Sequence, residues 1–193
     1  MGIVLFLAFT TNVTWASMAM TKWDLWSGSV ELRGANIWLG RADDPIYEGT
    51  LGAEKYGAGF KQSDFNALAA TGANLVNISH PGLFSIAPPY TLDLQAQTSL
   101  DNLLKMIEKA DMFAVITMRT GPGRSEWTFQ WGNDKTSDPV NGWFPASYYN
   151  EEVWQQQAAQ DAWAKMWEHI ATHYKNNKVV VAYDLMCKPN GKI

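Results

Sequence analysis

Apolar and polar positions along the chain form two alternating patterns, one typical of strands and one typical of helices. Apolar runs at residues 73–79, 113–118 and 179–186 each predict a strand. The runs at 113–118 and 179–186 are of the type that is buried on both faces, as the strands of parallel sheets are. Residues 29–40 carry β-branched and apolar side chains around Arg33 and predict a strand that runs into a turn. The chain therefore contains four predicted strands.

The segments between these strands have helical periodicity. Residues 61–72 predict a short helix with Ser63 as its N-cap. Residues 99–112 place their large aliphatic side chains on one stripe and their charged side chains opposite, which is typical of an amphipathic helix. A long third helix is predicted from near Asn150 to near Asn176, because aromatic and apolar residues recur there at spacings of three and four.

This order of strands and helices predicts an α/β fold with a parallel sheet and right-handed crossovers. The loops that follow strands are longer than those that follow helices, and long loops at strand C-terminal ends build the active sites of such folds. An open doubly wound sheet and a closed (β/α)8 barrel both fit the order. No G-x-G-x-x-G or G-x-x-x-x-G-K-[ST] sequence follows a strand, which disfavours a nucleotide-binding open sheet. A closed barrel typically needs about 250 residues, so four strands supply only half of one.

Composition favours one packed globular domain and excludes several partners. Hydrophobic residues make up 47% and charged residues 18% of the chain, which argues against disorder. The net charge is −4 and no Lys/Arg cluster exists, so neither nucleic acid nor an anionic membrane is an expected partner. Cys187 is the single cysteine, which rules out an intrachain disulfide and a multi-cysteine zinc site.

The first residues of the chain have the pattern of a secretory signal. An apolar run at residues 3–9 is followed by Ser17 and Ala19, which are spaced like a signal-peptidase site. The run is too short to span a bilayer, and no basic residue precedes it. We expect a signal peptide over residues 1–19, a mature domain over residues 20–193 and a secreted or periplasmic protein. A misplaced start site and a buried N-terminal segment are the alternatives.

The segment after the third predicted strand gathers charged and planar side chains. It contains Arg119, Arg124, Glu126, Trp127 and Trp131 among further aromatic residues. Sugars present flat C–H faces and a rim of hydroxyl groups, so aromatic platforms interleaved with polar groups suit carbohydrate. The alternative is an ordered loop packed on its own aromatic side chains.

The three histidines of the chain give no metal site or catalytic triad. His80 ends the second predicted strand, where a substrate contact and a structural hydrogen bond are both reasonable roles. His169 and His173 have a spacing that can chelate zinc, but no H-E-x-x-H context surrounds them, and we expect solvated helix surface. No serine lies in a G-x-S-x-G elbow.

Five sequence motifs, taken in order, resemble glycoside hydrolase family 5, the cellulase-like group of retaining β-glycosidases. They are "LRGANIW", "ANLVNISHPGLF", "PPYTLD", "DMFAVITMRTGPGRSE" and "YDLM-x-x-PN", between Trp26 and Asn190. The resemblance implies a (β/α)8 barrel, truncated here to about its first four strands, that acts on β-linked polysaccharide without a cofactor. It also implies a general acid/base glutamate at the end of strand four and a nucleophilic glutamate at the end of strand seven, both required by a retaining mechanism.

The chain departs from the family pattern at the positions of the catalytic residues and at two others. Lys188 occupies the acid/base position and Cys187 precedes it where asparagine is frequent, while the nucleophile has no position. An ammonium group has little tendency to protonate a glycosidic oxygen and repels an oxocarbenium ion. Asn77 stands where many members have arginine, and Arg119 where many have histidine. The remaining substrate-side candidates are Arg33, His80, Arg119, Glu126, Trp127 and Trp131.

Three hypotheses follow for the function of the chain. The first is the N-terminal portion of a secreted β-glycosidase, of the glucanase or mannanase type, that is inactive as given because both catalytic carboxylates are missing. The second is a non-catalytic carbohydrate-binding half-barrel that dimerises, since two open sheet edges and an uncovered apolar face favour self-association. The third is an unrelated α/β domain in which the aromatic residues are purely core.

Overall fold

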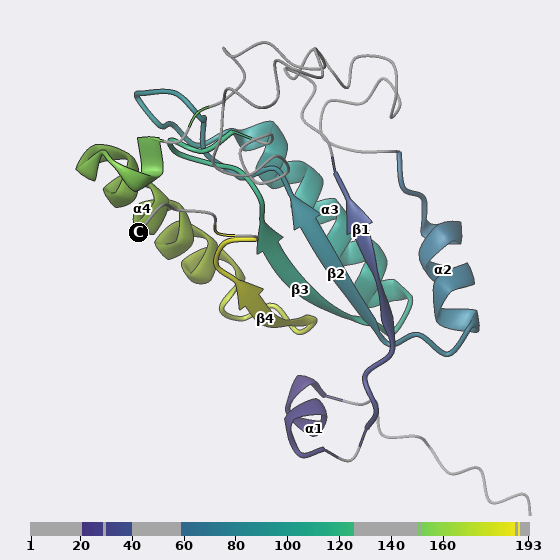
Figure 1. Cartoon of the computed structure of the whole chain (residues 1–193). Coiled ribbons are helices and arrows are strands. Elements are labelled where there is room, and N and C mark those ends of the chain that lie inside the picture. The colour runs from purple at the N-terminus through teal and green to yellow at the C-terminus, as the bar shows by residue number, and fades with distance from the viewer. Residues whose placement is uncertain are drawn as a thin grey trace, which may run out of the picture.

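The computed structural model of the chain describes residues 21–28, 30–39, 59–125, 150, 152–187 and 189. At its centre is a parallel sheet of four strands in the order β1-β2-β3-β4 (Figure 1). The strands are β1 (Gly34–Trp38), β2 (Leu75–His80), β3 (Phe113–Met118) and β4 (Val180–Asp184). All neighbouring strands are parallel, so their C-terminal ends meet at one end of the sheet, as the sequence predicts.

Helices join and cover these strands. Within the described residues they are α1 (Lys22–Trp26), α2 (Gln62–Ala70), α3 (Leu94–Lys109), the 3-10 helix η4 (Glu152–Trp154) and α4 (Gln157–Tyr174). Side chains of α2, α3 and α4 share one hydrophobic core with the strands, and Figure 1 shows α3 behind β1 and β2. None of the described helices is long and apolar enough to cross a membrane.

Helix α1 lies apart from the others, at the end of the sheet where the strands begin (Figure 1). The Nζ of Lys22 donates a hydrogen bond to the carbonyl of Asn177 at 3.1 Å, which joins α1 to the turn before β4. This helix therefore occupies the end of the molecule opposite to the strand C-termini.

The limits of the helices differ from the sequence prediction at their N-termini. Helix α2 begins at Gln62 with Lys61 as N-cap, so the prediction of Ser63 as cap is wrong; the carboxylate of Asp64 accepts the Lys61 N–H at 2.8 Å and fixes the earlier start. Helix α3 begins at Leu94 because the Asp93 carboxylate accepts hydrogen bonds from two backbone N–H groups of the first turn.

Helix α4 starts later than predicted. The segment near Asn150 forms η4 instead, because the N–H of the buried Val153 donates to the carbonyl of Gly123 at 2.9 Å. The α-helix begins only at Gln157 and ends at Tyr174, close to the predicted end. A tertiary hydrogen bond thus overrides the helical periodicity of the first residues.

The two faces of the sheet differ in chemistry. The face toward the helices is apolar and fully buried, with Val76, Ile78, Ala114, Ile116 and Met118 all at 0% exposure. On the other face, Thr117 Oγ1 donates to Asn77 Oδ1 at 2.6 Å, and Asn77 Nδ2 donates to Asn36 Oδ1 at 2.9 Å. The prediction of a buried strand is therefore wrong for β4, the edge strand of the described sheet, which becomes exposed at Asp184, while Asn77 on β2 is half-buried.

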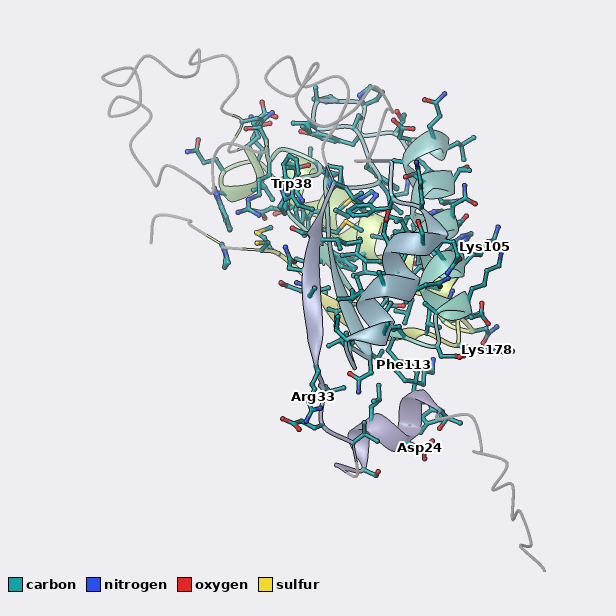
Figure 2. All side chains as sticks on the ribbon, turned by 90° about the vertical axis from the view of Figure 1, so that its right-hand side faces the viewer. Asp24, Arg33, Trp38, Lys105, Phe113 and Lys178 are labelled. Carbon is teal, nitrogen blue, oxygen red and sulfur yellow. The ribbon has the colours of Figure 1, made fainter. Side chains whose placement is uncertain are left out.

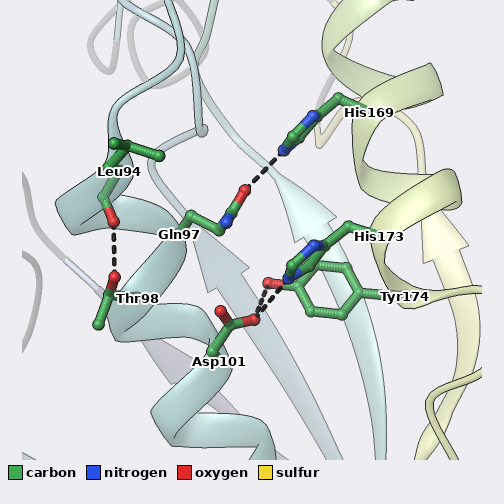
Figure 3. A network of polar contacts seen from close by, with 7 residues as sticks. All are labelled: Leu94, Gln97, Thr98, Asp101, His169, His173 and Tyr174. Carbon is green, nitrogen blue, oxygen red and sulfur yellow. Dashed lines mark hydrogen bonds and ion pairs between the residues drawn. The ribbon is translucent and has the colours of Figure 1, made fainter.

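Helices α3 and α4 are joined by a polar network (Figure 3). The Nε2 of His169 lies 2.6 Å from Gln97 Oε1, and the Nε2 of His173 lies 3.0 Å from the Asp101 carboxylate, which also accepts from the Tyr174 hydroxyl at 2.9 Å. The two imidazole rings stack with centroids 6.0 Å apart. The prediction of solvated helix surface agrees with His173, which is exposed, and is wrong for His169, which is half-buried between the two helices.

Candidate functional site

The C-terminal ends of the strands bring polar and aromatic side chains together. The strand register places Trp38 on β1 beside Ser79 on β2, Ser79 beside Thr117 on β3, and Thr117 beside Asp184 on β4. Ile37 packs against the core on the helix side, so its neighbour Trp38 lies on the opposite face, where the asparagines are. This row of four residues is the centre of the candidate site.

Arg119 ties the ends of three strands together just beyond β3. Its guanidinium donates to the Ser79 carbonyl, to Ser79 Oγ at 3.0 Å and to the Leu39 carbonyl at 2.5 Å. The same group lies 4.6 Å from the centroid of the Trp38 ring, within the range of a cation–π contact. Only 2% of Arg119 is exposed, so it fixes the geometry of the site and holds the half-buried Trp38 in place.

The turn after Arg119 is held by a second buried arginine. Arg124 Nη1 donates to the Arg119 carbonyl at 2.8 Å, and the backbones of Gly121 and Arg124 exchange hydrogen bonds at 3.1 and 2.9 Å. Gly123 has φ of +67°, and a Cβ there would lie 2.8 Å from the Val153 backbone nitrogen, so this position requires glycine. The start of the loop after β3 is consequently stiff.

His80 lies at the end of β2, as predicted, but its side chain is at 0% exposure. His80 lies on the same face of β2 as Val76 and Ile78, the face toward the helices. Its carbonyl accepts the Arg119 N–H at 3.0 Å. Direct contact between the imidazole and a polysaccharide would require the site to rearrange. In this structure His80 contributes to the shape of the strand end.

Arg33 is not brought together with His80 and Arg119. It precedes β1 and forms an exposed ion pair with Glu31 at 2.5 Å. Figure 2 shows Arg33 and Trp38 at opposite ends of the same strand. The candidates Glu126, Trp127, Trp131 and Lys188 lie outside the described residues.

The segment after β4 continues along the end of β3. The N–H of Cys187 donates to the Met118 carbonyl at 3.0 Å, and the Met186 N–H donates to the Asp184 carboxylate at 3.3 Å. Cys187 therefore lies beside the end of β3, and position 188, which follows it, is outside the described residues. Burial raises the pKa of the Tyr183 phenol on the helix side of β4, which keeps this hydroxyl neutral.

Sequence reasoning missed Trp38 and Ser79 as site residues. The available signal was the alternation in "NIW": the apolar Ile37 must face the core, which turns Asn36 and Trp38 to the other face. The contact with Arg119 could not be found this way, because it joins residues far apart in sequence. Among the described residues, no three His, Cys, Asp or Glu side chains come together in a way that could hold a metal ion.

A parallel βα sheet with its polar groups at the strand C-terminal ends is the architecture of the enzyme-bearing (β/α)8 barrels, here represented by the first half. The family model described as cellulase (glycosyl hydrolase family 5) matches residues 39–193, and the chain belongs to this family. The comparison with curated proteins gave no match.

Solved structures support the same fold. An endogalactoceramidase is similar with a TM-score of 0.57 and 18% identity over 83% of this chain, and endo-glycoceramidase II from Rhodococcus sp. with 0.57 and 20% over 84%. Cel5A of Thermotoga maritima, in complex with cellobiose, has a TM-score of 0.51 and 16% identity over 83%. The chain spans 40%, 41% and 44% of these three proteins, about two fifths of their length.

Proposed function

We propose that this cellulase-like domain binds β-linked oligo- or polysaccharide across the C-terminal ends of β1 to β4. The observation that carries the proposal is the arrangement of Trp38 and Arg119 beside Ser79 in a member of family 5. An indole braced by a buried cation offers a flat platform for a sugar ring, and the neighbouring polar groups suit its hydroxyls. The cellobiose and cellobiose-like complexes of the structural neighbours support the same ligand class.

The chain on its own is proposed not to hydrolyse its ligand. A retaining glycosidase needs two carboxyl groups about 5–5.5 Å apart, one as acid/base and one as nucleophile. By its motif the acid/base position is Lys188, and an ordinary lysine with a pKa of about 10.4 is a cation at neutral pH. The family nucleophile belongs to a seventh strand, and the described sheet has four. The chain spans about two fifths of the length of the neighbours, so the proposal concerns this stretch of the barrel alone.

Calorimetric titration of the purified chain, combined with a product assay, tests both parts. We expect saturable binding of cello- or manno-oligosaccharides, and no reducing sugar from β-glucan or β-mannan. Glycosylceramide micelles form a third arm that distinguishes glycolipid sugars from soluble ones. Absence of binding in every arm would overturn the proposed ligand class, whereas hydrolysis with retention of configuration would overturn the proposed inactivity.

A second candidate function is a non-catalytic sugar-binding half-barrel that pairs with another copy of itself. The observation that favours it is the edge position of β1 and β4 in the described sheet. Sedimentation of the chain would give a concentration-dependent dimer on this account. A folded monomer at all concentrations would contradict it.

Export is proposed on the sequence pattern of residues 1–19, which lie outside the described residues. Expression in a secreting host, followed by N-terminal sequencing, should give a mature chain that begins at Met20. An uncleaved product retained in the cytoplasm would contradict export.

A further inference from the structure

Two tryptophans of α4 converge on one carbonyl of the segment that leads to position 188. Trp163 Nε1 donates to the Leu185 carbonyl at 3.2 Å, and Trp167 Nε1 donates to the same oxygen at 2.8 Å. A carbonyl oxygen has two lone pairs, so both bonds can form at once. The side chain of Leu185 is itself 62% exposed and does not anchor the segment.

Each indole also contacts a second element of the site. The Trp167 ring meets the Tyr183 ring on β4 edge to face, with centroids 5.7 Å apart. The Trp163 ring packs under the loop after β3, where a Cβ on Gly121 would lie 3.0 Å from its Cζ3. Trp163, which is 7% exposed, therefore joins the loops that leave β3 and β4.

We propose that Trp163 and Trp167 are positioning residues that fix the β4 exit, defined as residues 185–187, relative to Arg119 and the end of β3. The hydrogen bond from Cys187 N–H to the Met118 carbonyl completes the attachment on the other side of the exit. By its motif, the position that follows the exit is the family acid/base position, so a fixed exit bears on the site. The two indole hydrogen bonds to the Leu185 carbonyl are called the clamp below. The biological role of the clamp rests on the proposed carbohydrate function, but its existence does not.

Amide hydrogen exchange of Cys187 tests the clamp directly. If the indole bonds hold the exit, Trp163→Phe or Trp167→Phe should speed exchange of the Cys187 amide about fivefold, and the double variant more than about tenfold. The amides of Ile78 and Ile116, inside the sheet, should keep their protection, because a merely global loss of stability would raise all rates together. Unchanged Cys187 exchange in the double variant would overturn the clamp.

Trp154→Phe is the matched control. The Trp154 Nε1 is buried and has no acceptor within the described part of the chain, so the substitution removes an indole N–H without removing a hydrogen bond to the exit. It should leave Cys187 exchange unchanged. If Trp163→Phe fails to fold, benzothienylalanine at position 163 preserves the ring shape and lacks the N–H donor. An effect of that replacement equal to the control would also overturn the proposal.

A sugar titration of the same variants separates positioning from stability. The affinity for cello-oligosaccharide should fall in the Trp167→Phe variant and stay unchanged in the Trp154→Phe control. Faster Cys187 exchange with unaltered affinity would overturn the positioning role. Failure of the wild-type chain to bind sugar would instead overturn the proposed function, while the exchange result still decides the clamp.

Discussion

At the scale of single residues, Arg119 is the side chain on which the geometry of the site depends most. It is buried and donates to the carbonyls of Ser79 and Leu39. Its place could be predicted from its position after a buried strand. The face on which Trp38 lies could also be predicted, from the alternation in "NIW", but its contact with Arg119 could not, because that contact joins β1 to the end of β3.

Replacement of Arg119 should destabilise the fold far more than replacement of an exposed arginine. We expect Arg119→Met to lower the free energy of unfolding by about 2–4 kcal/mol, since the carbonyls of Ser79 and Leu39 lose the buried guanidinium as a donor. The matched control Arg33→Met removes an exposed ion pair and should change it by less than about 0.5 kcal/mol. Urea unfolding measures both, and equal losses in the two variants would show that Arg119 does not clamp the strands.

At the scale of elements, periodicity predicted every described strand and the three helices that cover the sheet. It could not place the helix starts, which depend on local acceptors such as the Asp93 and Asp64 carboxylates. Nor could it reveal that η4 interrupts the long helix, because the Gly123 carbonyl that holds Val153 comes from a distant loop. The side-chain pattern was thus enough to predict whether a segment forms a helix or a strand. Where each helix begins is determined by hydrogen bonds that the pattern does not reveal.

The contact between α3 and α4 should be sensitive to mild acid. Burial and the neighbouring His173 lower the pKa of His169 below its usual 6.5. The folded state therefore binds this proton less readily than the unfolded state, so stability is fully present above about pH 6.5 and is lost as the pH falls below it. The groups that face His169 are Gln97 and Phe84, with His173 and Asp101 one turn away.

Comparison of the wild-type chain with His169→Gln tests this pH dependence. Thermal unfolding between pH 7.5 and pH 5.5 should show a smaller loss of stability in the variant, because glutamine retains a polar contact and does not titrate. Parallel curves for the two proteins would show that His169 does not contribute to the acid sensitivity.

At the scale of the whole molecule, the sequence motifs identified the family and the half-barrel, and the family match and the parallel sheet agree with them. Two of the six substrate-side candidates, His80 and Arg119, lie near the strand C-termini, and Arg33 lies at the other end of the sheet. Strand direction explains the difference: Arg33 comes before β1, and His80 and Arg119 come at or after the ends of their strands.

The proposed function depends on sugar binding at the C-terminal ends of the strands. Chemical-shift mapping by NMR, with a cello-oligosaccharide added to the ¹⁵N-labelled chain, tests it most directly. We expect shifts of the Trp38 indole N–H, of the Arg119 amide and of the Cys187 amide, with the Arg33 amide unchanged. Shifts confined to the Arg33 end of the sheet, or none at saturating sugar, would contradict it.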